Sequence, residues 1–113
     1  YREEDGISVQ HVLQSHTGVI RVFPAVPNDF EGGFENLGAQ GGFIISSERT
    51  PSGVRFVQIE SLAENDCAVA NPWPAKSVRV TDETDNRSSL LNEDKGVLHF
   101  QSAKNHVYRL TAE

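Results

Sequence analysis

QSHTGVIRVFPAVP, at residues 14–27, is the stretch that decides the fold of this 113-residue chain. Its centre, residues 19–23, is an apolar run of strand-forming side chains that Gly18 opens and a single arginine interrupts. Two prolines close the run, and proline belongs at strand ends or edges because it has no N–H to give to a sheet ladder. We therefore expect residues 19–23 to form a buried first strand, on or beside which the later strands pack.

Short apolar runs recur along the rest of the chain, with turn residues between them. They lie at residues 43–47, 54–59, 67–70, 76–80, 90–91, 97–101 and 106–110. The run at 54–59 changes phase, which indicates either burial on both faces or a β-bulge near Phe56. We expect the last two runs to pair with each other as a hairpin.

The spacing of these runs predicts the fold class. They number about eight and recur about every ten to twelve residues, which is typical of sandwiches and barrels. The glycine-rich segment at residues 28–43 predicts turns and left-handed backbone. Because no long helical period is present, the sequence predicts an all-β fold, an antiparallel two-sheet β-sandwich with about eight short strands.

The length fits one domain with one core. We interpret residues 1–12 as a linker or N-terminal extension and residues 13–113 as a single β-sandwich domain. The sequence begins with Tyr1 and contains no methionine, which favours a piece of a longer protein with this domain as its C-terminal part.

Charge and cysteine content narrow the range of partners. Ten basic and sixteen acidic side chains give a formal net charge of −6, and no basic cluster is present, so we expect no nucleic-acid partner. The apolar runs are too short to span a bilayer, so we expect no membrane partner. Cys67 is the single cysteine, which excludes an internal disulfide and favours a small buried apolar role.

The sequence holds no local set of residues that indicates catalysis. His11 and His16 lie close in sequence but lack an obvious third ligand, and the acidic loop at residues 81–87 lacks the glycine and terminal glutamate of an EF-hand. The carboxylates lie mostly in loops, and we interpret His99 and His106 as surface or hydrogen-bonded histidines. We therefore expect no catalytic residue, metal or cofactor in this chain.

Trp73 is the one candidate binding residue, because it stands between two prolines in the segment NPWP. A rigid backbone would hold the indole in one orientation. One interpretation is a platform on which a sugar ring stacks, and the other is packing in the core or against another domain. We favour packing, because large aromatic side chains mostly serve that purpose.

Three phrases carry a resemblance to a known family. The first resembles LLQSH-x-G-x-I-x-LLPALP, and its matching residues are Leu13, Gln14, Ser15, His16, Gly18, Ile20, Pro24, Ala25 and Pro27. The second resembles LRARGGF, and its matching residues are Leu37, Ala39, Gly41, Gly42 and Phe43. A looser third match comprises Cys67, Val69, Asn71, Pro72 and Trp73. The phrases are similar to those in the C-terminal β-domain of glycoside hydrolases with an (α/α)6-barrel, in particular the α-L-fucosidase family numbered 95.

The resemblance implies a function for the chain within a larger enzyme. It implies a non-catalytic accessory domain that packs against the upstream catalytic domain of the same chain. The parent would be an exported bacterial glycoside hydrolase, periplasmic or extracellular, acting on plant or host glycans. The family's catalytic acid and base would lie in the barrel, so none is assigned to a position here. An independent carbohydrate-binding module, with glycan as partner, is the alternative, and a protein-interaction domain that pairs through strand edges is a third.

Overall fold

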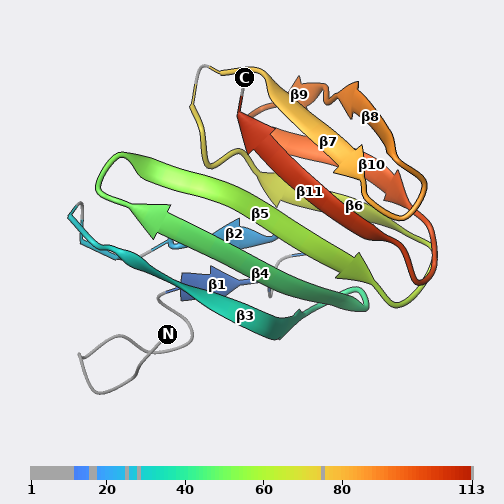
Figure 1. Ribbon diagram of the computed structural model, residues 1–113, viewed down its shortest axis with the longest axis horizontal. Coiled ribbons are helices and arrows are strands. Elements are labelled where there is room, and N and C mark those ends of the chain that lie inside the picture. The colour runs from blue at the N-terminus through green and yellow to red at the C-terminus, as the bar shows by residue number, and fades with distance from the viewer. Residues whose placement is uncertain (1–11, 16–17, 25, 28, 75, 113) are drawn as a thin grey trace.

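The structure, a computed structural model, describes residues 12–15, 18–24, 26–27, 29–74 and 76–112. In this part of the chain eleven strands form three antiparallel sheets (Figure 1). The expected all-β fold is confirmed, and the sheets are consistent with a β-sandwich. The strands are more numerous than expected because several of them are two-residue pairings that leave no periodicity in the sequence.

One layer is a six-stranded sheet. Its strands lie in the order β3 (Gly32–Ala39), β4 (Phe43–Thr50), β5 (Gly53–Ser61), β11 (Val107–Ala112), β7 (Val78–Asp82) and β8 (Arg87–Leu90). Alternate side chains point into the core, as in β4, where Phe43, Ile45 and Ser47 are buried. This alternation follows from the two-residue repeat of an extended backbone.

The remaining strands form two smaller sheets. One has the order β6 (Asn65–Ala70), β10 (Val97–Ser102) and β9 (Glu93–Asp94), and the other pairs β1 (Leu13–Gln14) with β2 (Arg21–Val22). Ile20 forms a parallel bridge with Val69 of β6, and its N–H donates to the carbonyl of Ala68 at 2.8 Å. The bridge joins the small hairpin to the edge of the three-stranded sheet.

The expected first strand is much shorter than predicted. Only Arg21 and Val22 of residues 19–23 form a ladder, although Ile20, Val22 and Phe23 are buried as expected. Phe23 has a φ of +52°, a left-handed conformation that ends the strand. Its ring instead packs 5.5 Å from that of Phe34, in the first strand of the large sheet. Residues 19–23 therefore contribute more to the core through their side chains than to a sheet through backbone pairing.

The prediction of turns for the glycine-rich segment is wrong over residues 32–39. These residues form β3, an edge strand of the large sheet that pairs with β4 along its length. The register shifts between Phe34 and Leu37, and Asn36 within that shift has a φ of +57°. A bulge and a left-handed residue allow this glycine-rich sequence to pair, which composition alone does not reveal.

Of the two alternatives predicted for residues 54–59, the structure has the bulge near Phe56. Glu48 pairs with Phe56 and Arg49 with Val54, so Arg55 is the extra residue on β5. The bulge explains the change of phase, because it restores the inward position of Val57 after an unpaired residue.

The predicted hairpin between the last two runs is wrong. β10 pairs with β6 and β9, whereas β11 pairs with β5 and β7, so the turn between them crosses from one sheet to the other. The turn from β5 to β6 crosses in the same way. The N–H of Ser61 donates to the carbonyl of His106 at 2.9 Å, and that of Asn105 donates to the carbonyl of Ser61 at 2.7 Å. These bonds hold the two crossings side by side.

Candidate functional site

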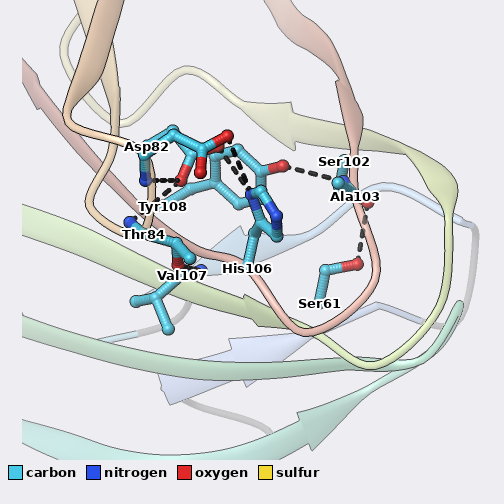
Figure 2. A network of polar contacts seen from close by, with 9 residues as sticks. Ser61, Asp82, Thr84, Ser102, Ala103, His106, Val107 and Tyr108 are labelled. Atoms are coloured by element: carbon cyan, nitrogen blue, oxygen red, sulfur yellow. Dashed lines mark hydrogen bonds and ion pairs between the residues drawn. The ribbon is translucent and has the colours of Figure 1, made fainter.

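A cluster of polar side chains lies beside these crossings, where the turn from β7 to β8 begins (Figure 2). Asp82 is the last residue of β7, and one of its carboxylate oxygens, Oδ1, accepts the N–H groups of Thr84 at 3.0 Å and Asp85 at 3.2 Å. Aspartate commonly begins a turn in this way, because its short side chain reaches the backbone two residues on. The other oxygen, Oδ2, is left to face β11.

His106 reaches that oxygen from the turn that precedes β11. Its Nδ1 lies 2.8 Å from Oδ2 of Asp82 and 3.9 Å from Oδ2 of Asp85. The imidazole stacks on the ring of Tyr108 at 6.2 Å between centroids, and the N–H of His106 donates to the carbonyl of Ala103 at 3.2 Å. Backbone and ring contacts thus fix the imidazole against the two carboxylates.

The contact shifts the pKa of both partners in the directions expected of an ion pair. The hydrogen bond to Asp82 raises the pKa of His106 above 6.5, and burial opposes this only in part. Burial alone would raise the pKa of Asp82, but bonds from His106 and from the N–H groups of Asp85 and Thr84 together hold it below 3.8. The histidine is therefore charged at a higher pH than a free one.

The same three side chains could in principle ligate a cation, since their donor atoms lie within 4.8 Å of one another. A metal ligand must offer a lone pair, however, and Nδ1 here faces a carboxylate that favours the protonated ring. Two backbone N–H groups already occupy Oδ1 of Asp82. The arrangement serves best as an ion pair that ties the turn of residues 82–87 to the start of β11.

Trp73, the predicted sugar-binding residue, lies in the core cluster with only 8% of its surface exposed. Its Nε1–H donates to the carbonyl of Val54 at 2.5 Å, and its backbone N–H donates to Oδ1 of Asn71 at 2.8 Å. An indole held in this way offers little aromatic face to a sugar ring. These contacts favour the packing interpretation, and sugar binding at Trp73 stays a prediction.

The other residues considered from sequence do not join the cluster. Cys67 is fully buried, and burial raises the pKa of its thiol to about 12, as expected of a small apolar core residue. His99 is exposed on β10. His11 and His16 lie outside the described residues. The pairing of His106 with Asp82 was missed, because 24 residues separate the two in sequence and nothing in either segment indicates the contact.

Comparison with known proteins identifies a family. The sequence model of the glycoside hydrolase family 95 C-terminal domain matches residues 14–110, which is most of the chain. No curated protein sequence matches the chain. In the described part of the chain, no helix has the length and hydropathy needed to cross a membrane.

Proposed function

Since the chain belongs to the family of glycoside hydrolase family 95 C-terminal domains, an accessory domain of these enzymes, we propose that it packs against the catalytic domain of its parent and takes no part in the chemistry. The family match over residues 14–110 is the observation that carries this proposal. The first phrase of the resemblance lies at the start of the matched region, where the family's catalytic barrel would hand over to this domain.

The cluster of Asp82, Asp85 and His106 does not have the arrangement that glycoside hydrolysis needs. Glycoside hydrolysis ordinarily needs two carboxyl groups about 5–9.5 Å apart on either side of a sugar-sized cleft. Asp82 and Asp85 instead share one turn and one histidine partner. The phenol of Tyr108 is also engaged, because its oxygen accepts the N–H of Ala103 at 2.7 Å. These groups stabilise crossings between sheets.

Two exposed apolar side chains are consistent with contact to another domain. Leu62, in the turn after β5, is 45% exposed, and Leu90, at the end of β8, is 54% exposed. Single exposed leucines are common on protein surfaces, so they support the proposal only alongside the family match.

The parent, in this proposal, is an exported bacterial enzyme resembling α-L-fucosidases, so that the domain works in the periplasm or outside the cell. The resemblance in residues 13–27 and 37–43 supports this part of the proposal. Its test is the parent's activity on aryl α-L-fucosides compared with other aryl glycosides. Preference for a different sugar would contradict the fucosidase assignment and leave the accessory role standing.

Three measurements test the accessory role. The 113-residue chain should release no phenol from a panel of aryl glycosides, even at protein concentrations far above those at which an active glycosidase gives a signal. The parent enzyme should lose thermal stability when it is truncated before residue 13. A Leu62→Ser, Leu90→Ser variant of the whole parent enzyme tests whether the catalytic domain covers those two side chains. Turnover by the isolated chain would refute the non-catalytic role, and an unchanged melting temperature of the truncated catalytic domain would refute the packing.

A further inference from the structure

The outward face of β3, β4 and β5 is hollowed into a groove of about 940 Å³. This face is the opposite of the one that buries Phe43, Ile45 and Val57. The volume lies within the range of roughly 300–1,000 Å³ typical of small-molecule sites. The three strands are eight or nine residues long and lie side by side at one edge of the large sheet (Figure 1).

The two bulges and a pair of glycines shape this groove. Bulges bend the strand that carries them, and here they lie at Asn36 on β3 and at Arg55 on β5, on opposite sides of the central strand. Gly32 and Gly33 line the groove without side chains. At Gly33 a Cβ would lie 2.5 Å from the carbonyl oxygen of Ser47, so the close approach of these two strands requires a bare backbone.

The lining is polar, carries one more acidic than basic side chain and includes the half-buried ring of Phe56. Its side chains include three glutamates, two arginines, and the amide and hydroxyl groups of Asn36, Ser46 and Gln58. Glu48 and Arg55 pair with each other at 2.9 Å, and Arg49 donates to the carbonyl of Pro27 at 2.9 Å. One glutamate–arginine pair is thus matched within the protein, and both of its members stay solvent-accessible.

Phe56 adds an apolar surface beside these polar groups. It is half-buried, and the guanidinium of Arg109 covers one face of its ring at 4.0 Å from the centroid. The stacked cation holds the ring in a fixed orientation. An aromatic surface flanked by donors and acceptors suits a ligand that has both C–H patches and many hydroxyl groups.

We propose that the groove of β3, β4 and β5 binds a neutral oligosaccharide. The lining offers donors and acceptors together, which hydroxyl groups use equally well. A phosphate or nucleic-acid ligand would need an excess of positive charge, which a lining of three glutamates and two arginines does not have. Glu48, Arg55 and Gln58 hydrogen-bond the sugar, and Phe56 packs against its C–H face. This binding does not depend on the packing proposed above, and each can fail without the other.

Amide chemical shifts of the ¹⁵N-labelled 113-residue chain test the proposal. Cellotetraose, mannotetraose and 2′-fucosyllactose are titrated as neutral probes, and tetragalacturonate as the anionic comparison. At least one neutral probe should shift the amides of Ser46, Glu48 and Gln58 saturably, while tetragalacturonate shifts them little. An Arg55→Ala, Gln58→Ala variant should bind about tenfold or more weakly, since each substitution removes hydrogen bonds to the ligand.

Lys104→Ala is the matched control, because Lys104 is an exposed cation in the turn before β11 and does not line the groove. Lys104→Ala should bind the neutral probes as tightly as the unmutated 113-residue chain does. Circular dichroism should show the same fold for the unmutated chain, the groove variant and Lys104→Ala. The proposal is overturned if no neutral probe shifts groove amides, if the shifts centre on Trp73 instead, or if the groove variant binds with unchanged affinity.

Discussion

Nδ1 of His106 lies 2.8 Å from Oδ2 of Asp82, and this contact joins two turns that are 24 residues apart in sequence. The turn after β7 and the turn before β11 have no direct sequence connection, so the ion pair is a tertiary tether. Thr84 reinforces it, since its Oγ1 accepts the N–H of Val107 at 3.0 Å. The tether has a pH dependence that follows from the shifted pKa values.

Asp82→Asn should remove that pH dependence while keeping the turn. The raised pKa of His106 gives stability that is present below 6.5 and lost as the pH rises through the raised value. The lowered pKa of Asp82 gives stability that is present above 3.8 and lost as the pH falls through the lowered value. The melting temperature of Asp82→Asn should therefore lie below that of the unmutated chain, and the difference should be largest between about pH 4 and 6.5.

Melting temperatures from pH 2 to 9 measure this difference. Asn keeps an oxygen for the N–H groups of Thr84 and Asp85, so the turn itself should survive. Asp94→Asn, an exposed carboxylate on β9, is the control and should change the profile little. An equal difference in melting temperature at every pH would show that attraction between charged His106 and charged Asp82 does not stabilise the fold.

Trp73 should contribute to stability through both volume and its hydrogen bond. Trp73→Phe leaves the carbonyl of Val54 without its indole donor and should cost about 1–3 kcal/mol, whereas Trp73→Ala also opens a cavity and should cost about 3–5 kcal/mol. Urea unfolding measures both, with Pro74→Ala, at an exposed neighbouring position, as the control. Full stability of Trp73→Ala together with lost sugar binding would restore the stacking interpretation.

The alternation of apolar residues was enough to predict which side chains face the core. Val78 and Val80 in β7, and Tyr108 and Leu110 in β11, are apolar or aromatic residues two positions apart, and all four are buried. The same spacing cannot show which strands pair, because inward-facing residues look alike in a hairpin and in a crossing between sheets. The expected pairing of β10 with β11 was wrong for that reason.

The groove and the ion pair were beyond prediction for related reasons. The groove depends on bulges in β3 and β5, and only the second of these disturbs an apolar pattern that the sequence displays. In β3 the bulge lies between Phe34 and Leu37, and these two apolar residues are too few to show a periodicity that it could interrupt. The ion pair depends on two turns being adjacent, which follows only from the complete strand order.

Gly33→Ala should destabilise the fold more than Gly38→Ala does. At Gly33 the added Cβ would lie 2.5 Å from the carbonyl oxygen of Ser47 and 3.1 Å from Cα of Glu48, both of them backbone atoms. The strands must separate locally, at a cost of about 1–3 kcal/mol. At Gly38 nothing lies within 4 Å of the added Cβ, so that variant should be close to neutral. Equal free energies of unfolding for the two variants would contradict the close approach of β3 and β4.

Ser61 and Ser102 should be energetically coupled, because they join the two crossings from inside the protein. Both are buried, with 0% and 1% of their surfaces exposed, and their hydroxyl oxygens lie 2.8 Å apart (Figure 2). Each hydroxyl also donates to a backbone carbonyl, Ser61 to that of Ala63 and Ser102 to that of Asn65 at 2.6 Å. Each single alanine substitution therefore leaves a carbonyl without this donor and should cost about 1–3 kcal/mol. The double variant should cost less than the sum of the two, by about 0.5 kcal/mol or more. A double-mutant cycle in urea measures this, with exposed Ser77→Ala as control, and strict additivity would show that the two crossings are stabilised independently.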